Sequence, residues 1–369
     1  MTSLFIGLVN FLNDVLHVEP ISIVADAGFW LLILLIGYPL AAVAVLFRMI
    51  YRVLGWCLGG GGKVDPRANN TQELAVFVTG CDSGFGRQVV EPLTARGFTV
   101  FCGCLHKSSF QHFQANALAI PVQLDVTSDK SVMEAYKVVA SWMSAGSKKQ
   151  RHFHALVNNA GIIRAGTVDW AKMPDFQATM SVNFYGVLRC VKEFMPIFKK
   201  QASEGTYSGA RIVTMSSISG LFLGGDCITP YVCSKHAVDS MTENLRSEMM
   251  PYGVQVVCIN PGFHSTPMAD PKSTEEAVCN IWNALSPSQR EDYGKGYLQA
   301  FRDGFNPIKY FSWDSRHVVN AIENSIIDRY PAVRELVGLD AKYGFAFLRL
   351  LPTGLGVPTI RVKPACMQR

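Results

Sequence analysis

The feature that most constrains the fold is a glycine-rich turn that directly follows a short apolar run. Residues 74–78 are apolar without alternation, as is typical of a buried parallel strand, and lead into the turn 79–86 (TGCDSGFG). The expected start of a helix, 87–93, and a second apolar run, 99–104, follow. This order of strand, tight turn, helix and strand predicts an α/β fold with a Rossmann-type doubly wound parallel sheet.

Each glycine of the turn has a separate physical role. Gly80 permits the tight turn out of the strand, Gly84 lets the backbone approach a pyrophosphate, and Gly86 lets the helix pack closely on the strand. The helix N-terminus offers free N–H groups and the positive end of its dipole to phosphates. The turn therefore predicts a dinucleotide site, which also includes Ser83 and Phe85.

The end of the second strand leaves the choice of dinucleotide open. In this fold an acid at that place binds the 2′-hydroxyl of the adenosine ribose and favours NAD. Here the strand ends in Cys104-Leu105-His106-Lys107, without an acid. Lys107 and His106 could contact the 2′-phosphate of NADP, or they could be solvated. The residues alone thus favour NAD and NADP about equally.

Two further strands lead to polar residues at the same predicted edge of the sheet. The strand 120–126 contains Asp125, whose carboxylate could bond the adenine amino group or cap the next helix. The strand 153–157 runs into NNAG (158–161). Small residues there let a cofactor lie close over the strand ends, and the Asn side chains can hold the turn. The cofactor contacts expected here are Asn158, Ala160 and Gly161.

A fifth strand, 212–217, is followed by residues suited to acid–base chemistry. Tyr231 comes 14 residues after Ser217, and Lys235 lies one helical turn beyond Tyr231. A free tyrosine titrates at about 10, and an adjacent ammonium stabilises the phenolate and lowers that pKa. Ser217 can hold the substrate oxygen. The trio predicts hydride-transfer chemistry on an alcohol or carbonyl, for which no metal is needed.

Together these motifs resemble the short-chain dehydrogenase/reductase superfamily, in order and spacing, over about residues 74–340. The matching segments are TGCDSGFG (79–86), NNAG (158–161), Ser217, YVCSK (231–235) and NPG (260–262).

This resemblance implies a role for each matching residue. Tyr231 would be the acid/base, Ser217 would bind the substrate oxygen, and Lys235 would hold the nicotinamide ribose and tune Tyr231. Asn183 would anchor a proton-relay water. The remaining cofactor contacts, around the nicotinamide, would be Pro261, Gly262 and Thr266.

Finer features resemble one branch of that superfamily. The CDSGFG form of the turn and 329–331 (RYP) are similar to retinol dehydrogenases, type 2 17β-hydroxysteroid dehydrogenase and mitochondrial 3-hydroxybutyrate dehydrogenase. The resemblance implies NAD(H), with NADP still open, a steroid or retinoid substrate, and a homodimer or tetramer. A small hydroxy acid such as 3-hydroxybutyrate is the alternative substrate. A non-catalytic membrane scaffold is disfavoured because Tyr231, Lys235 and the glycines are all present.

The N-terminal region predicts a membrane anchor. Residues 27–47 hold no charge, and at 1.5 Å per residue such a helix spans about 30 Å, the thickness of a bilayer core. Arg48 and Arg52 follow the span, and acidic residues precede it, which places the C-terminal side in the cytosol. We expect the endoplasmic reticulum membrane with a cytosolic catalytic domain; a mitochondrial membrane is the alternative.

The chain accordingly divides into three parts. Residues 1–72 are the anchor and a linker that contains Gly59–Gly62, residues 73–340 are the dehydrogenase domain, and residues 341–369 are an apolar C-terminal extension. Segments after the sixth strand would cover the substrate. There Tyr293, Tyr297, Phe301 and Phe305 could line an apolar pocket or simply pack in the core.

Charge and cysteine content exclude other classes of function. The net charge of +5 comes without a run of five basic residues, so nucleic acid is not an expected partner. The ten cysteines form no CxxC pair and no zinc-like spacing with histidines, which predicts free thiols and no metal site.

Overall fold

The computed structural model describes residues 73–145, 150–221, 228–266, 271–294, 296–299 and 312–345, all within one compact unit. In these ranges no helix is both long and apolar enough to cross a membrane. The predicted span at 27–47 and the extension beyond residue 345 lie outside the described residues, as do Phe301 and Phe305.

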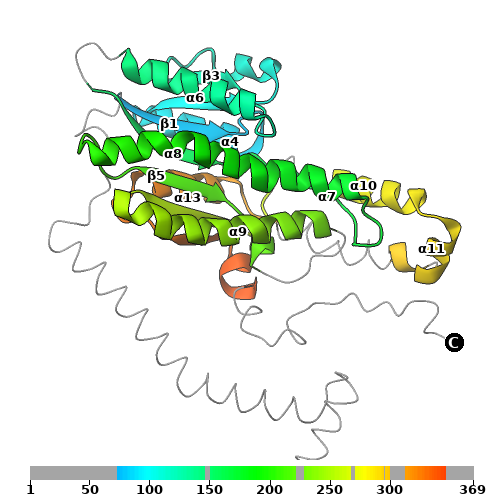
Figure 1. Ribbon diagram of the computed structural model, residues 1–369. Helices are drawn as coiled ribbons and strands as arrows, with labels where there is room; N and C mark the ends of the chain where they lie inside the picture. Colours follow the sequence, from blue (N-terminus) through cyan, green and yellow to red (C-terminus); the bar gives the residue numbers. More distant parts are fainter. Residues whose placement is uncertain are drawn as a thin grey trace, which may run out of the picture. The chain divides into compact units, whose positions relative to one another are not determined.

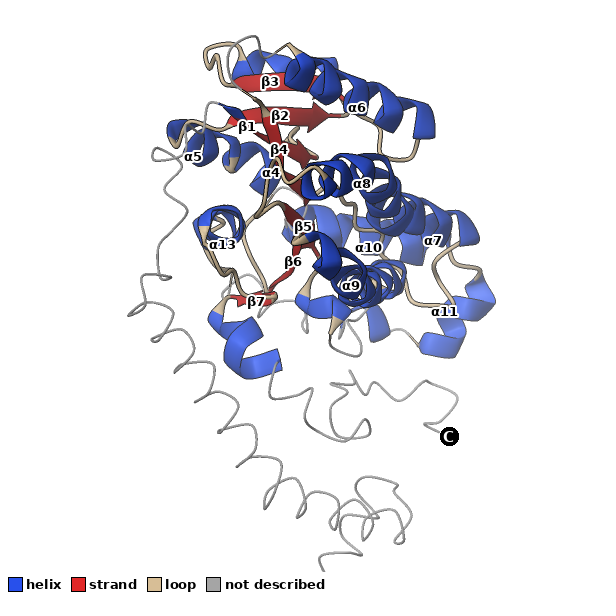
Figure 2. Cartoon of the chain, turned by 60° about the vertical axis from the view of Figure 1, so that its left-hand side comes forward, coloured by secondary structure: helices blue, strands red, loops and turns tan. Residues whose placement is uncertain are grey.

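Seven parallel strands form one sheet in the order β3-β2-β1-β4-β5-β6-β7 (Figures 1 and 2). The first strand, β1, lies near the middle of the sheet; the chain then winds out to β3, crosses back and winds the other way from β4. This is the predicted doubly wound sheet. Its switch point lies between β1 and β4, where open α/β sheets bind ligands beyond the carboxyl ends of the strands. The strands are β1 (Leu74–Thr79), β2 (Thr99–Cys104), β3 (Ala119–Gln123), β4 (His152–Asn158), β5 (Arg211–Met215), β6 (Gln255–Pro261) and β7 (Arg334–Val337).

Helices cover both faces of the sheet, which is why the central strands are apolar without alternation. Figure 2 shows α5 (Val90–Ala95) and α13 (Arg316–Ile327) on one side, and α6 (Asp129–Ser144), α8 (Val187–Ser203) and α9 (Thr229–Met249) on the other. Along β1, Val76 and Val78 pack into the core on the α13 side of the sheet, and Ala75 and Phe77 pack into the core on the side of α6, α8 and α9. Phe77 stacks on Phe101 of β2 at 6.4 Å between ring centroids. The sheet is therefore the rigid middle layer of the domain.

The helix that leads into α8 contains an irregular turn. α7 (Met173–Met180), the π-helical turn η4 (Ser181–Gly186) and α8 follow without a break, and Asn183 lies in the π turn. Single π turns inside α-helices often mark functional sites because they free backbone groups and re-aim side chains.

Further helical elements connect the strands and the longer helices. α10 and α11 follow β6 and lie on the same side of the domain as α7 (Figure 1). The shorter elements are α4 (Gly84–Gln88), η3 (Lys107–Phe113), η5 (Ile218–Gly220), η6 (Met250–Tyr252), α10 (Pro271–Ala284), α11 (Pro287–Tyr293) and η8 (Asp340–Phe345).

Candidate active site

The glycine turn after β1 is closed against the loop after β4. Gly80 has φ +72°, and a Cβ there would lie 2.8 Å from the Cα of Ala160. A Cβ at Gly86 would lie 2.4 Å from the carbonyl oxygen of Gly80. Contacts this short exclude any side chain, so both positions need glycine for the tight turn and the close helix packing that the sequence predicts.

Gly84 differs from the other two glycines because it faces open space. Its φ is +57°, and nothing lies within 4 Å of a Cβ built there. Ser83, the N-cap of α4, makes no side-chain capping bond to the first turn. An uncapped helix start beside a bare glycine backbone has the donor chemistry and the room that a pyrophosphate requires. The residues present therefore fit a dinucleotide.

Asn159, not Asn158, holds the turn after β4. The Asn159 amide donates to the Thr79 carbonyl at 2.9 Å, and the backbone N–H groups of Asn159 and Ala160 donate to Thr79 Oγ1 at 2.9 Å. Asn158 is only 1% exposed, and its side-chain amide has no hydrogen-bond partner among the described residues. The sequence pattern pointed to the amide pair but did not single out Thr79 or Asn159.

Asp125 supports the turn before α6. Its Oδ1 accepts from the backbone N–H of Thr127 at 2.8 Å and from the Thr127 hydroxyl at 2.7 Å. The N-cap of α6 is Ser128, whose hydroxyl accepts from the Ser131 N–H. The capping role considered for Asp125 therefore belongs to Ser128, and Asp125 shapes the loop at the end of β3.

Three of the four predicted catalytic residues, all but Asn183, lie together beyond β5. Ser217 follows the strand, Tyr231 and Lys235 lie on the first turns of α9, and Ser217 is near enough to the Tyr231 side chain to influence its pKa. The Lys235 ammonium is 5.6 Å from the centre of the Tyr231 ring and donates to the Met215 carbonyl at 2.8 Å. The structure therefore brings together the three residues that their spacing predicts to meet.

The electrostatics of this trio differ from expectation in one respect. Burial raises the pKa of Tyr231, and the neighbouring Ser217 opposes that shift. The ammonium of Lys235 was expected to lower this pKa, but it is hydrogen-bonded to a backbone carbonyl instead of the phenol. Burial also lowers the pKa of Lys235 to about 8, opposed by nearby Cys258 and Asp239. Lys235 thus titrates within reach of neutral pH.

Asn183 ties the loop after β4 to the catalytic helix. Its Oδ1 accepts from the N–H of Ile162 at 2.8 Å, and its Nδ2 donates to the Ile162 carbonyl and to Ser234 Oγ, both at 2.9 Å. Ser234 in turn donates to the Tyr231 carbonyl at 2.7 Å. The Asn183 side chain is thus used for positioning the loop and the start of α9 against each other.

A buried network behind the trio was not expected from the sequence. Asn260, at the end of β6, donates to the Ser217 carbonyl at 2.9 Å and to Asp239 Oδ1 at 2.8 Å. Arg334 of β7 donates to Asn260 Oδ1 at 2.8 Å and pairs with Asp239 Oδ2 at 2.7 Å. Asp239 lies one turn beyond Lys235 on α9. The network therefore joins the segments that carry Ser217 and Lys235 to β7, a strand that comes much later in the chain.

The turn after β6 is shaped by an acid from the far end of the domain. The Phe263 N–H donates to Asp340 Oδ2 at 2.8 Å, and a Cβ at Gly262 would lie 2.1 Å from that oxygen. Gly262 is therefore required by the approach of Asp340, whatever else it contacts. Pro261 is the last residue of β6, and Thr266 is the last residue described before the gap at 267–270.

The aromatic residues expected near the substrate form a small separate core. Tyr293 and Tyr297 pack on Trp170, with ring centroids at 5.2 and 5.6 Å, and Trp170 lies 5.2 Å from Trp282. The Tyr293 hydroxyl donates to Asp169 at 3.0 Å. The core-packing alternative holds for both tyrosines, and the two tryptophans at its centre were missed. This core fastens α10 and α11 to the loop after β4.

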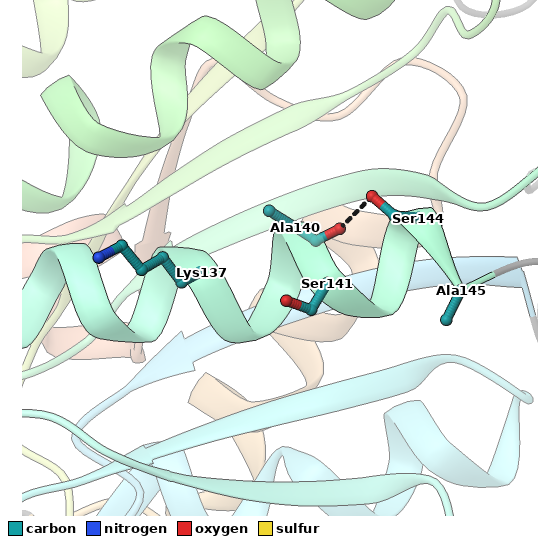
Figure 3. A pocket seen from close by; sticks show the side chains of 5 residues that line it. All are labelled: Lys137, Ala140, Ser141, Ser144 and Ala145. Atoms are coloured by element: carbon teal, nitrogen blue, oxygen red, sulfur yellow. Dashed lines mark hydrogen bonds between the residues drawn. The ribbon is translucent and has the colours of Figure 1, made fainter.

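A shallow surface hollow lies elsewhere, along the exposed side of α6 (Figure 3). It is lined by Lys137, Ala140, Ser141, Ser144 and Ala145, all from one helix or its end. Ser144 is occupied by a bond to the Ala140 carbonyl at 2.9 Å. None of the predicted site residues takes part, so this hollow carries none of the chemistry above.

Comparison with known proteins places this geometry in a family. The family model described as short chain dehydrogenase matches residues 74–277, more than half of the chain. The chain belongs to that family, and within it to the branch of retinol and steroid dehydrogenases. It is an NAD(P)-dependent oxidoreductase that acts on CH–OH groups.

Three curated relatives illustrate the branch. Human dehydrogenase/reductase SDR family member 9 is 32% identical and covers 83% of this chain and 94% of its own. Bovine 17-beta-hydroxysteroid dehydrogenase type 6 is 32% identical, covering 78% and 87%. Mouse retinol dehydrogenase 16 is 31% identical, covering 81% and 92%.

Solved structures share the fold at lower identity. A short-chain dehydrogenase/reductase from Burkholderia phymatum in complex with NAD has a TM-score of 0.56 at 23% identity, covering 71% of this chain and 88% of its own. A short-chain dehydrogenase from Burkholderia cenocepacia J2315 in complex with NADP has a TM-score of 0.53 at 24% identity, covering 73% and 89%.

Proposed function

We propose that this protein is a membrane-anchored dehydrogenase that transfers hydride between NAD(H) and a hydroxyl or carbonyl group of a lipophilic substrate, a steroid or a retinoid. The observation that carries the proposal is the placing of Ser217, Tyr231 and Lys235 beside one another at the sheet edge that also holds the open turn at Gly84. A dinucleotide at the switch point and a substrate oxygen at Ser217 would be neighbours.

Each catalytic side chain has a defined task in this mechanism. When bound, the nicotinamide accepts or supplies the hydride. Ser217 donates a hydrogen bond to the substrate oxygen, and Tyr231 takes the proton from an alcohol or returns it to a carbonyl. The Lys235 ammonium stabilises the phenolate that forms on Tyr231. Asn183 keeps the start of α9 in register with the loop that borders the cofactor.

The dinucleotide contacts follow the chain around the sheet edge. The turn after β1 would hold the pyrophosphate, the end of β3 would face the adenine, and the segment after β6 would face the nicotinamide. The proposed contacts are Gly80, Ser83, Gly84, Phe85, Gly86, Asp125, Asn158, Ala160, Gly161, Tyr231, Lys235, Pro261, Gly262 and Thr266.

Relatives and composition support a lipophilic substrate delivered from a membrane. The printed names of similar proteins include a steroid and a retinol dehydrogenase. The uncharged run 27–47 is long enough to span a bilayer. We assign 1–72 to the anchor and linker, 73–340 to the catalytic domain, and 341–369 to an apolar extension at the membrane surface. The catalytic domain would lie in the cytosol at the endoplasmic reticulum, as a homodimer or tetramer.

Turnover by the purified, detergent-solubilised full chain tests the proposal. NAD⁺ and NADP⁺ are each combined with a panel of retinoids, steroids and 3-hydroxybutyrate. Reduction of NAD⁺ with a steroid or retinoid is the expected result. Turnover of 3-hydroxybutyrate alone would assign the chain to a small-acid chemistry and contradict the lipophilic substrate. Tight cofactor binding without turnover of any member would contradict the assigned substrate class.

A further inference from the structure

We propose that Asp82 determines the preference of this enzyme for NAD(H) over NADP(H). The inference rests on the proposed function and names the residue that decides one part of it. Asp82 belongs to the glycine turn, but its side chain reaches across to the end of the neighbouring strand β2. There it occupies the groups that a 2′-phosphate would need.

Three donors at the end of β2 converge on the Asp82 carboxylate. The backbone N–H of Leu105 donates to Oδ2 at 2.8 Å, and that of His106 donates to Oδ1 at 3.0 Å. The Ser109 hydroxyl donates to Oδ1 at 2.8 Å. Two successive backbone N–H groups and a hydroxyl form the kind of concave donor set that binds an anion. In this chain the anion comes from the protein itself.

This position is the one that reads the adenosine ribose in a doubly wound sheet. The residue that decides between a 2′-hydroxyl and a 2′-phosphate normally stands at the end of the second strand. Here that strand ends in Cys104, Leu105, His106 and Lys107, and from sequence it lacks an acid. In the structure, Asp82 supplies an acid at this position. It lies 23 residues before Leu105 and 24 before His106 in the chain.

A second observation, the raised pKa of Cys104, shows the negative charge of Asp82 acting at the end of β2. Burial, and after it the charge of Asp82, raise the pKa of the Cys104 thiol to about 12. A group that disfavours one nearby negative charge disfavours another. A 2′-phosphate would meet a carboxylate at short range and would find the backbone donors already in use.

The positive groups near this place do not reverse the argument. Lys107 and His106 are exposed, so water and salt screen them. The Arg87 guanidinium is engaged by His112, with 3.2 Å between Arg87 Nη1 and His112 Nε2. Asp82, in contrast, is half-buried and held by three hydrogen bonds, so its charge stays fixed beside the ribose position.

The test is the binding of NADH and NADPH to the full chain, measured by fluorescence titration without substrate. The wild-type protein should bind NADH more tightly. Asp82→Asn removes the charge with little change of shape, and the ratio Kd(NADPH)/Kd(NADH) should fall by about tenfold or more. The matched control is Glu91→Gln, which removes the same charge from an exposed position on α5 and should leave the ratio unchanged. The same ratio measured with kcat/KM in turnover should move in parallel.

A second measurement needs no variant and holds even if Asp82→Asn fails to fold. Repulsion by Asp82 predicts that wild-type binding of NADPH strengthens relative to NADH as the ionic strength rises, whereas attraction by Lys107 predicts the opposite. Equal affinity of the wild-type chain for both cofactors, or an unchanged ratio in a folded Asp82→Asn variant, would overturn the inference. Failure to bind either cofactor would contradict the proposed function itself, and failure to turn over steroids or retinoids would leave the Asp82 result standing.

Discussion

The glycine turn and the Ser217–Tyr231 pair lie at the same carboxyl edge of the sheet but are supported by different kinds of contact. Around the glycine turn, the supporting groups belong to the motifs themselves, as Thr79 bonds the loop that contains Ala160. Behind Ser217, the supporting groups come from Asp239 and from Arg334, on a strand late in the chain. The cofactor half is thus supported by residues of its own motifs, and the catalytic half by residues that lie outside them.

The sharpest way to separate the two halves is to remove the acid–base group alone. Tyr231→Phe should lower kcat by about 10²- to 10⁴-fold, because the proton of the substrate hydroxyl loses its acceptor. The Kd for NADH should change far less than kcat, because Tyr231 is one of many proposed cofactor contacts and the glycine turn is untouched. Turnover measures kcat, and fluorescence titration of the same preparation measures the Kd for NADH. Undiminished turnover in this variant would refute the acid–base assignment.

The dependence of the catalytic half on β7 is tested at Arg334. Arg334→Met leaves Asp239 without its cation, and Asp239 is 8% exposed in its side chain. The unfolding free energy should fall by about 2–3 kcal/mol, and kcat should fall because Ser217 loses its fixed support. The matched control is Lys200→Met, which breaks an exposed pair with Glu204 and should cost no more than about 0.5 kcal/mol. Denaturant melts measure the unfolding free energy, and turnover measures kcat. If Arg334→Met changed neither quantity, the catalytic half would not depend on β7.

A third prediction concerns the other end of β4, away from both halves. Burial and nearby Arg211 lower the pKa of His154 to about 4, while its hydrogen bond to the Ile326 carbonyl opposes the shift. The unfolded chain, with an ordinary histidine pKa of about 6.5, therefore binds the proton more readily than the folded one. Stability attributable to His154 is full above pH 6.5 and is lost as pH falls towards 4, by about 2 kcal/mol between pH 7 and pH 5.

Chemical denaturation at pH 7 and pH 5 measures this effect. His154→Gln lacks the titrating group, so its loss of stability over that interval should be smaller than that of the wild-type chain by about 2 kcal/mol. Equal losses in the two proteins would show that His154 titrates normally in the fold. Because His154 lies remote from the site, kcat should respond only through the folded fraction.

The cofactor half can be tested with two glycines of matched geometry. Gly84 has φ +57° and Gly205 has φ +62°, and a Cβ at either meets nothing within 4 Å. An alanine at each should cost a similar backbone strain, about 1 kcal/mol. Only Gly84→Ala should also weaken NADH binding, by about tenfold, because its Cβ would stand between the backbone and the pyrophosphate. Equal Kd values in the two variants would remove Gly84 from the cofactor site.

The contrast between the halves also explains what the sequence could predict. The doubly wound sheet, the need for glycine at positions 80 and 86, and the nearness of Ser217, Tyr231 and Lys235 all follow from local order and spacing. Such signals are carried by a strand, a turn or one helix face, each within a few residues.

The residues that the sequence did not predict act over long separations. β7 is four residues long with charges at Arg334 and Glu335, so it lacks an apolar strand pattern. Asp82 contacts the end of β2 only because β1 and β2 are neighbours in the sheet. Trp170 and Trp282 meet only through the folding of α10 onto the loop after β4. None of these pairings leaves a periodic or motif signal in either segment alone.

Transfer of deuterium tests the central claim most directly. The steroid or retinoid alcohol with the fastest turnover is labelled with deuterium at the carbinol carbon and incubated with the full chain and NAD⁺, and the reduced cofactor is analysed by mass spectrometry. The account predicts one deuterium per reduced nicotinamide from the wild-type chain and almost no labelled product from Tyr231→Phe. Reduced cofactor without the label, or equal labelling by both proteins, would contradict it.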